Sequence, residues 1–154
     1  LPAQETIVQA NPSNRPTSPR LDTAPACRRR LLIVDDDVGT ATVLAMTMSE
    51  YGHSVEVAHN GADALAAAER FRPDVVFLDL VMPGMSGFEV VRALRALPGL
   101  PNVLIAALTG WNDQVTRMAV VEAGFDRHLV KPPYLAEIFD VLACAAQGGG
   151  AVTR

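Results

Sequence analysis

The chain has 154 residues, of which 49% are hydrophobic, 19% are charged and 5% are aromatic. This composition suits one domain of ordinary size with a mainly aliphatic core. The formal net charge of −4 argues against direct binding of nucleic acid, which usually requires a basic face. No apolar run in the sequence approaches the roughly 20 residues that span a bilayer, so we expect no membrane contact by this segment.

The two cysteines, Cys27 and Cys144, lie far apart in the sequence and lack the spacing of a metal site. One disulfide would add little to a domain of this size, so the pattern favours a reduced chain. No signal-peptide pattern is present. We therefore expect a cytoplasmic location.

Residues 1–28 differ in composition from the rest of the chain. They contain five prolines separated mainly by polar residues, and no apolar periodicity runs through them. Such a segment buries too little apolar surface to fold alone, so we expect a flexible, Pro-rich linker over 1–28. Because glycines fill positions 148–150, we expect one folded domain over 29–146 and a C-terminal tail over 147–154.

Short apolar runs alternate with helical patterns along the expected domain. The runs that suit buried strands lie at 31–34, 54–58, 75–78, 103–108 and 129–130. Apolar residues at helical spacing predict helices near 43–51, 62–70, 88–97, 113–123 and 135–142. Alternating strands and helices imply right-handed crossovers, so we predict an α/β, doubly wound parallel sheet with helices on both faces.

Polar residues follow the ends of the predicted buried strands. Asp35 and Asp36 follow the first strand, Asp79 the third, Thr109 the fourth and Lys131 the fifth. The carboxyl ends of parallel strands share one edge, where ligands bind, so we expect these side chains to converge. Clustered carboxylates repel one another unless a cation lies among them, and hard oxygen ligands favour Mg²⁺.

This set of groups suits phosphoryl transfer. The reaction requires a nucleophilic oxygen, a metal ion that neutralises developing charge, and donors for the phosphoryl oxygens. One carboxylate can attack as the anion without a general base, while the other carboxylates hold the metal ion. Lys131 and the Thr109 hydroxyl can then stabilise the transferred group.

Four short motifs resemble the signature set of response-regulator receiver domains: Val34-Asp35-Asp36, Leu78 to Pro83, Leu108-Thr109-Gly110 and Val130-Lys131-Pro132. The resemblance covers about 29–146. It implies a five-stranded sheet of flavodoxin-like order 2-1-3-4-5. It also implies a domain of two-component phosphorelay signalling, which takes a phosphoryl group from a phosphohistidine on a histidine kinase or a histidine phosphotransfer domain.

The resemblance assigns roles to the acidic residues. Asp79 is the phospho-acceptor. Asp36 and Asp79 bind Mg²⁺ directly, together with the backbone carbonyl of Val81. Asp35 acts on the metal ion through water.

The resemblance also assigns roles to residues that respond to the phosphoryl group. Thr109 bonds a phosphoryl oxygen and moves on activation, and Lys131 pairs with the acyl phosphate. The Lys131–Pro132 peptide bond is expected to be cis, which costs little before proline. The family's switch position, which is often aromatic, is occupied by His128.

One further hypothesis rests on the residues themselves, and a second expectation comes from the resemblance. Trp111 and Val81 flank the acyl phosphate, and neither offers a side chain suited to orienting an attacking water, so we expect slow self-dephosphorylation. Activation is expected to reshape the face formed by 111–123 and 129–146. We expect this face to be the partner surface and the candidate surface for a homodimer.

Several residues near the site have simpler interpretations. Asp37 is expected to cap the helix that follows it rather than to bind metal, since aspartate is a favoured N-cap. Gly84 and Gly87 are expected to be turn residues. His53 and His59 are expected to be surface residues near turns.

Two other functions compete with the receiver. A haloacid-dehalogenase-type phosphatase also uses an aspartate nucleophile and Mg²⁺, and the acidic run at 35–37 offers its Asp-x-Asp spacing. That class expects threonine where Gly39 stands and an acidic metal pair after the lysine, whereas Glu137 and Asp140 are the only carboxylates after Lys131. The second alternative is a receiver-like docking module that is never phosphorylated, although all five site residues are present.

The sequence leaves the output of the domain open. The residues after the last predicted helix hold no effector segment, so we expect this fragment to be no enzyme beyond autocatalysed phosphotransfer and self-dephosphorylation. A start without methionine and a Pro-rich linker before a receiver resemble the C-terminal end of a hybrid sensor histidine kinase, whose parent chain would be a kinase. A stand-alone single-domain response regulator is the alternative.

Overall fold

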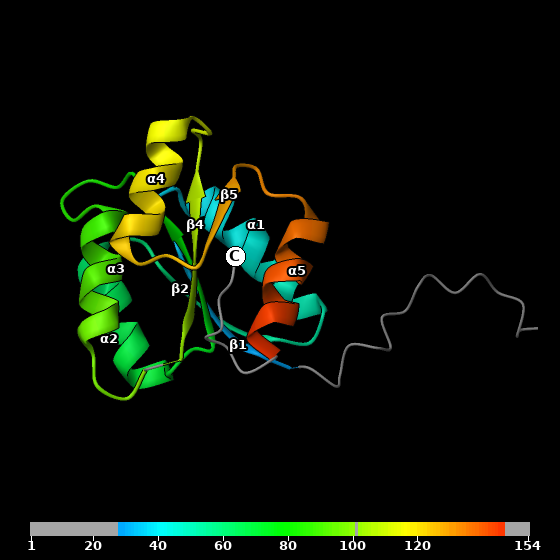
Figure 1. Cartoon of the computed structure of the whole chain (residues 1–154). Coiled ribbons are helices and arrows are strands. Elements are labelled where there is room, and N and C mark those ends of the chain that lie inside the picture. The colour runs from blue at the N-terminus through cyan, green and yellow to red at the C-terminus, as the bar shows by residue number, and fades with distance from the viewer. Residues whose placement is uncertain (1–27, 101, 147–154) are drawn as a thin grey trace, which may run out of the picture.

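The structure is a computed structural model that describes residues 28–100 and 102–146 (Figure 1). The expected tail at 147–154, and all of the expected linker except Arg28, lie outside the described residues. Within those ranges, none of the helices is long and apolar enough to cross a lipid bilayer.

Five parallel strands form a single sheet. Their order across the sheet is β2-β1-β3-β4-β5, which confirms the predicted order and fold class. The three central strands are buried on both faces along their apolar runs, as strands covered by helices on each side must be. The strands are β1 (Arg30–Val34), β2 (Ser54–Ala58), β3 (Val75–Asp79), β4 (Leu104–Thr109) and β5 (Arg127–Val130).

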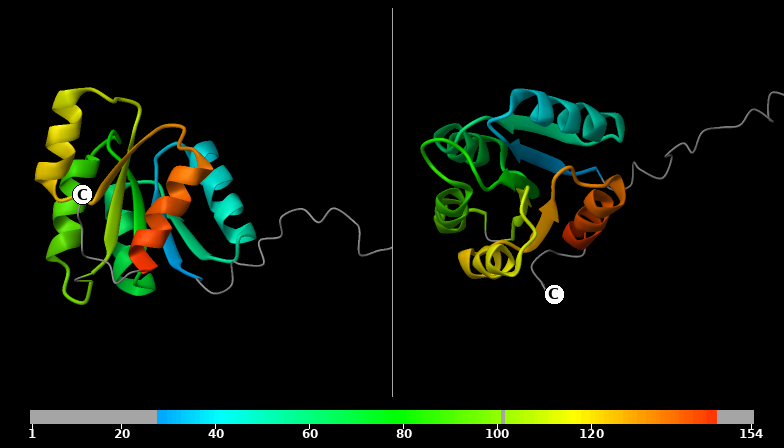
Figure 2. Two further views of the ribbon diagram at one scale, coloured as in Figure 1. Left: turned by 45° about the vertical axis from the view of Figure 1, so that its right-hand side comes forward. Right: turned by 90° about the horizontal axis from the view of Figure 1, so that it is seen from above.

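Five helices cover the two faces of the sheet (Figure 2). One face is covered by α1 (Val38–Glu50) and α5 (Leu135–Ala146), and the other by α2 (Gly61–Phe71), α3 (Gly87–Ala96) and α4 (Gln114–Ala123). Each face therefore has its own aliphatic core layer.

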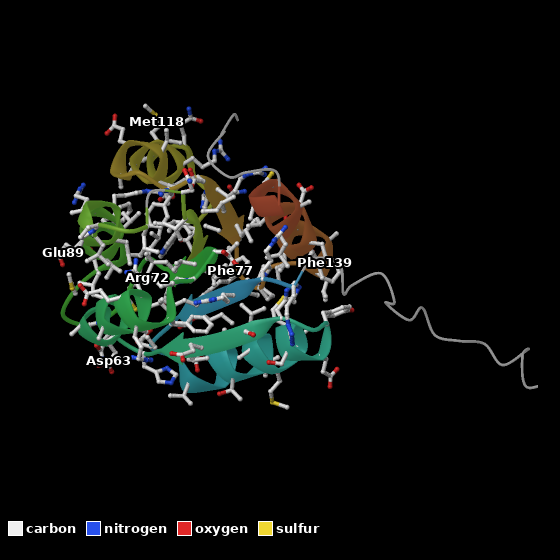
Figure 3. All side chains as sticks on the ribbon, turned by 90° about the horizontal axis from the view of Figure 1, so that it is seen from below. Asp63, Arg72, Phe77, Glu89, Met118 and Phe139 are labelled. Carbon is white, nitrogen blue, oxygen red and sulfur yellow. The ribbon has the colours of Figure 1, made fainter. Side chains whose placement is uncertain are left out.

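Phe77 marks the centre of one of these core layers (Figure 3). It is fully buried in β3, on the face that α1 and α5 cover. The low aromatic content of the chain is thus compatible with a filled interior, because leucine, isoleucine, valine and alanine occupy most of the buried positions.

The strand order reverses next to β1, and this reversal locates the site. From β1 the chain passes to β2 on one side, and then returns to β3 on the other side of β1. Val34 accordingly pairs with Ala58 in β2 and with Leu78 in β3. Such a reversal leaves a crevice at the carboxyl ends of the strands, where ligands of open α/β sheets bind.

Asp37 caps the helix that leads away from this edge. Its side chain accepts hydrogen bonds from the N–H groups of Gly39, at 3.1 Å, and Thr40, at 3.4 Å. These contacts lower the pKa of the Asp37 carboxyl group, the hydroxyl of Thr40 contributing most. The predicted capping role is confirmed, so Asp37 is engaged in holding the start of α1.

Candidate functional site

Three carboxylates converge at the carboxyl edge of the sheet, the edge to which the arrowheads point in Figure 1. Asp35 and Asp36 follow β1, and Asp79 is the last residue of β3. One carboxylate oxygen from each residue lies within 4.8 Å of those of the other two. Asp35 and Asp79 are buried and Asp36 is exposed, so the acidic cluster has one side open to solvent.

Lys131 brings a cation to this cluster. It follows β5, and its backbone N–H donates to the Thr109 carbonyl at 2.8 Å. Its Nζ lies 2.9 Å from Asp35 Oδ2 and 3.4 Å from Asp79 Oδ1. The bond from Lys131 to Pro132 is cis, as predicted. The ammonium group therefore contacts two buried carboxylates and partly offsets their charge.

Burial sets the acidity of Asp79. Loss of solvent, reinforced by the neighbouring Asp35 carboxylate, raises the pKa of Asp79 to about 6, although Lys131 and the Val81 N–H act in the opposite direction. Burial also acts to lower the pKa of the Lys131 ammonium, but Asp35 and Asp79 outweigh it and hold that pKa above its usual value. At neutral pH, Asp79 is thus mainly ionised beside a charged lysine.

The donor set fits a hard divalent cation such as Mg²⁺. Asp35 Oδ1 accepts a hydrogen bond from the Asp37 N–H at 2.9 Å. Asp35 Oδ2 is buried and, apart from its ion pair with Lys131, receives no hydrogen bond from the described residues. Three carboxylates beside one ammonium leave excess negative charge, and oxygen ligands are those that Mg²⁺ prefers.

Val81 lies at the same edge of the sheet. Its N–H is 3.4 Å from Asp79 Oδ1. This contact places the backbone of Val81 next to Asp79, and binding of a metal ion by its carbonyl stays a prediction.

Thr109 is the last residue of β4, and His128 is the second residue of β5. Thr109 is buried, and its Oγ1 accepts a hydrogen bond from the Trp111 N–H at 3.0 Å. His128 is half-buried, and its Nε2 is buried without a hydrogen bond from the described residues. Burial lowers the pKa of the His128 imidazole, against the effect of a backbone contact with Trp111. The Trp111 backbone therefore contacts Thr109, which is predicted to respond to the phosphoryl group.

The side chains of Trp111 and Val81 lie at the rim of the site. They are 62% and 66% exposed, so neither is packed into the interior. Each follows a site residue, Thr109 or Asp79, by two positions. That Trp111 and Val81 flank an acyl phosphate on Asp79 stays a prediction.

Two histidines make contacts beyond the sequence-based expectation. His59 is half-buried, and its Nδ1 lies 2.9 Å from the backbone carbonyl of Asp35. His53 is also half-buried, and its Nδ1 accepts a hydrogen bond from the Arg29 N–H at 3.0 Å. Both histidines are partly exposed, and each imidazole also completes a backbone hydrogen bond at one end of β2, which the expectation from sequence did not include.

The two glycines near Asp79 have different roles. Gly84 has a φ of +81°, a conformation that favours glycine, so its predicted turn role is confirmed. Gly87 is instead the first residue of α3, and a Cβ atom there would collide with the Asp79 carbonyl oxygen. The turn interpretation of Gly87 is wrong, since its small size lets α3 approach the Asp79 backbone.

Comparison with known proteins agrees with this geometry. The family model of the response regulator receiver domain matches residues 31–143. The DNA-binding response regulator MtrA of Mycolicibacterium paratuberculosis is 41% identical over 105 residues, which are 68% of this chain and 45% of MtrA. The transcriptional regulatory protein AfsQ1 of Streptomyces coelicolor is 38% identical over 66% of this chain and 44% of its own. The chain thus spans less than half the length of these relatives.

Solved structures show the same fold. The Vibrio cholerae chemotaxis protein CheY4 superposes with a TM-score of 0.72 at 30% identity, over 77% of this chain and 98% of its own. The receiver domain of the Pseudomonas aeruginosa sensor histidine kinase PA1611, which has a magnesium ion coordinated in its active-site cleft, gives a TM-score of 0.68 at 30% identity, over 75% of this chain and 94% of its own. On the match of the family model, this chain belongs to the response regulator receiver domain family.

Proposed function

We propose that this receiver domain accepts a phosphoryl group from a phosphohistidine onto Asp79 and thereby switches a signalling surface. The observation that supports this most is the position of Asp79, a buried carboxylate 3.4 Å from Lys131 Nζ and beside two further carboxylates. The site therefore combines a nucleophile with preorganised charges that can stabilise a transferred phosphoryl group.

In the proposed step, an Asp79 carboxylate oxygen forms a bond to phosphorus while the phosphorus–nitrogen bond of the donor breaks. The electron pair stays with the imidazole nitrogen, which takes a proton from solvent. Because Asp79 is mainly ionised above its pKa of about 6, it attacks as the anion and needs no general base. Lys131 then pairs with the acyl phosphate.

Asp35, Asp36 and Asp79 would hold Mg²⁺, with the Val81 carbonyl as a further ligand. When bound, the ion would offset the negative charge of the phosphoryl oxygens. The buried Asp35 Oδ2, which lacks a hydrogen bond from the described residues, supports this assignment. The magnesium ion in the PA1611 receiver domain adds support by analogy.

The output side of the switch starts at Thr109. Turning its hydroxyl toward a phosphoryl oxygen would release the Trp111 N–H. Such a change would shift the population of positions that α4 adopts. Three exposed apolar side chains mark the outer side of α4, namely Val115, Met118 and Val121, and Figure 3 shows Met118 pointing away from the molecule. We propose this side of α4, with β5 and α5, as the surface for a partner or a homodimer.

The donor must contact the surface around Asp79, because its phosphohistidine has to reach that carboxylate. Val81 is exposed at the mouth of the site, and α1, which starts beside the acidic pair, exposes Val38, Val43 and Met46 by more than half. Glu50 is the only charged residue of α1. We propose that this apolar side of α1 receives the donor protein.

We propose no enzymatic activity on external substrates for this segment, only phosphotransfer to itself and loss of its own phosphoryl group. The proposal also places the domain in the cytoplasm, with response regulators in general. The related proteins MtrA and AfsQ1 are a response regulator and a transcriptional regulatory protein, which favours a regulator separate from its kinase over the hybrid kinase expected from the sequence. The PA1611 receiver keeps the hybrid kinase as the second candidate.

The sequence encoded on either side of this segment in its gene distinguishes these two contexts. A DNA-binding domain would support the separate regulator. A kinase ATP-binding domain would support the hybrid kinase.

Incubation of the chain with acetyl phosphate and Mg²⁺ tests the proposed function. Intact-mass measurement should show one added phosphoryl group per chain, and a chelator should prevent the addition. No added mass in the presence of Mg²⁺ would contradict the proposal and favour a docking module. Steady turnover of a phosphate monoester would favour the phosphatase alternative.

A further inference from the structure

The residues after β2 hold the backbone of the acidic pair. The Asp35 N–H donates to the Ala58 carbonyl at 3.1 Å, and His59 Nδ1 lies 2.9 Å from the Asp35 carbonyl oxygen. A carbonyl oxygen can only accept a hydrogen bond, so His59 Nδ1 carries the proton and donates it. Both polar groups of the Asp35 backbone are thus satisfied by the end of β2.

The imidazole of His59 makes one more hydrogen bond beyond the end of the β1–β2 pairing. The pairing of β1 with β2 stops at Val34 and Ala58. One residue further on, a side-chain donor takes the place of a main-chain donor. Among the described residues, the Asp35 carbonyl would otherwise have no hydrogen-bond donor at the point where the chain leaves the sheet.

This hydrogen bond fixes the peptide group that joins Asp35 to Asp36. Among the described residues it is the only hydrogen bond that this peptide group makes, and the Asp36 carboxylate has no hydrogen bond or ion pair with any of them. A peptide group is planar, so holding the Asp35 carbonyl also fixes the direction in which the chain enters Asp36. The direction of the exposed Asp36 side chain is therefore set by the backbone that holds it.

We infer that His59 is a positioning residue for the metal-binding carboxylates, an inference that rests on the proposed function. Its imidazole holds the Asp35–Asp36 peptide group so that the Asp36 carboxylate faces Asp35 and Asp79. Groups that orient metal ligands without touching the metal typically change its affinity by about 10–100-fold when they are removed. Loss of the His59 donor should therefore weaken the binding of Mg²⁺ without removing any ligand.

Calorimetric titration of the full chain with MgCl₂ tests this inference, using four proteins. His59→Leu keeps an apolar side chain of similar size but loses the donor, and should weaken Mg²⁺ binding by about tenfold. His59→Asn places an amide N–H near the position of Nδ1 and should bind within about threefold of the wild type. His53→Leu removes the equivalent half-buried imidazole contact at the other end of β2 and should leave the affinity unchanged.

The outcomes separate the inference from the proposed function. Equal Mg²⁺ affinity in the wild type and His59→Leu would overturn the positioning role alone, as would equal weakening in His59→Leu and His59→Asn. A wild-type chain that binds no Mg²⁺ would overturn the positioning role and the proposed function together. If His59→Leu does not fold in a thermal-unfolding control, His59→Gln replaces it, since its longer side chain misplaces the donor. Wild-type affinity in His59→Gln would then overturn the role.

Discussion

Asp79 is a buried carboxylate whose ionised form its surroundings disfavour. It is buried beside Asp35, and one ammonium group does not balance the charge of the cluster. Its pKa is raised to about 6, so the folded chain binds a proton at Asp79 at pH values where the unfolded chain has already released it. The contribution of Asp79 to stability therefore falls as pH rises from about 4 through 6.

Asp79→Asn should stabilise the metal-free chain at about pH 8 by on the order of 1 kcal/mol, a value discounted for partial solvent access. The gain arises because the neutral amide avoids ionisation beside Asp35, and it should shrink as pH falls below 6, where wild-type Asp79 becomes protonated. Thermal unfolding in a chelator at several pH values measures it. Asp140→Asn, at an exposed position on α5, is the control. A gain that is independent of pH, or equal in the control, would contradict the account.

The side chain of Trp111 concerns a second property of the proposed acceptor, the lifetime of its phosphorylated form. Its side chain lies at the exposed rim, where a carboxylate could orient water toward the acyl phosphate. Trp111→Glu should shorten the lifetime of phosphorylated Asp79 by roughly tenfold, since a positioned general base accelerates attack by water. Val115→Glu, at an exposed position on α4, should leave the lifetime unchanged. Equal lifetimes in Trp111→Glu and the wild type, measured as decay of the phosphorylated mass, would remove the proposed rim effect.

At the scale of single elements, α3 and the acceptor strand are joined through Gly87. The helix starts so close to β3 that an added Cβ would meet the Asp79 carbonyl oxygen and the Leu80 Cα. Ser86 and Glu89 form a capping box at the same helix end. The start of α3 thus sets the position of the Asp79 backbone.

Gly87→Ala should destabilise the domain by about 1–3 kcal/mol, because the backbone atoms that its Cβ would meet have little room to move. It should also slow phosphorylation by acetyl phosphate, since Asp79 must shift to relieve the collision. Gly39→Ala in α1 is the matched control: its Cβ would make an ordinary contact, and alanine should add up to about 1 kcal/mol of helix stability. Chemical denaturation measures the free energy of unfolding of both variants. Equal stability of Gly87→Ala and Gly39→Ala would show that α3 does not lie too close to β3 for a Cβ atom at position 87.

The buried strands, the edge strand β2 and most helix ends could be predicted from sequence, whereas the edge strand β5 could be predicted only in part. The apolar runs of β1, β3 and β4 are long because helices cover both of their faces. β5 pairs on one side only, and it begins with Arg127 and His128, both half-buried, so its apolar run covers only the last two residues. An edge strand with polar residues gives a weak periodic signal.

The site could be predicted wherever a charged side chain lies at the carboxyl end of a strand, as it does at Asp35, Asp79 and Lys131. His59 and Gly87 could not be assigned in this way. The role of His59 depends on the pairing of β1 with β2, which brings residues 24 positions apart into contact. The role of Gly87 depends on how closely α3 approaches β3. Both are consequences of tertiary geometry that no local motif records.

At the scale of the whole molecule, the sheet lies between the proposed donor surface on α1 and the α4 part of the proposed output surface. The acceptor lies at one edge, the apolar side of α1 borders it on one face, and α4 lies on the other face (Figure 2). A donor bound on α1 would therefore leave α4 free to change position.

The double substitution Val43→Glu with Met46→Glu should lower phosphotransfer from a phosphohistidine protein by about tenfold or more, as expected for a loss of at least 1.4 kcal/mol in docking. Both side chains are exposed, so folding should be unaffected. Phosphorylation by acetyl phosphate, which needs no docking surface, is the internal control. Val121→Glu on α4 should keep both reactions. An unchanged transfer rate in the double variant would show that the donor binds elsewhere.

The central claim is that Asp79 receives the phosphoryl group, and intact-mass measurement of Asp79→Asn after incubation with acetyl phosphate and Mg²⁺ tests it most directly. The wild-type chain should gain one phosphoryl group, and Asp79→Asn should gain none while remaining folded by circular dichroism. An equal gain in mass by Asp79→Asn would contradict the account, because a residue other than Asp79 would then be the acceptor.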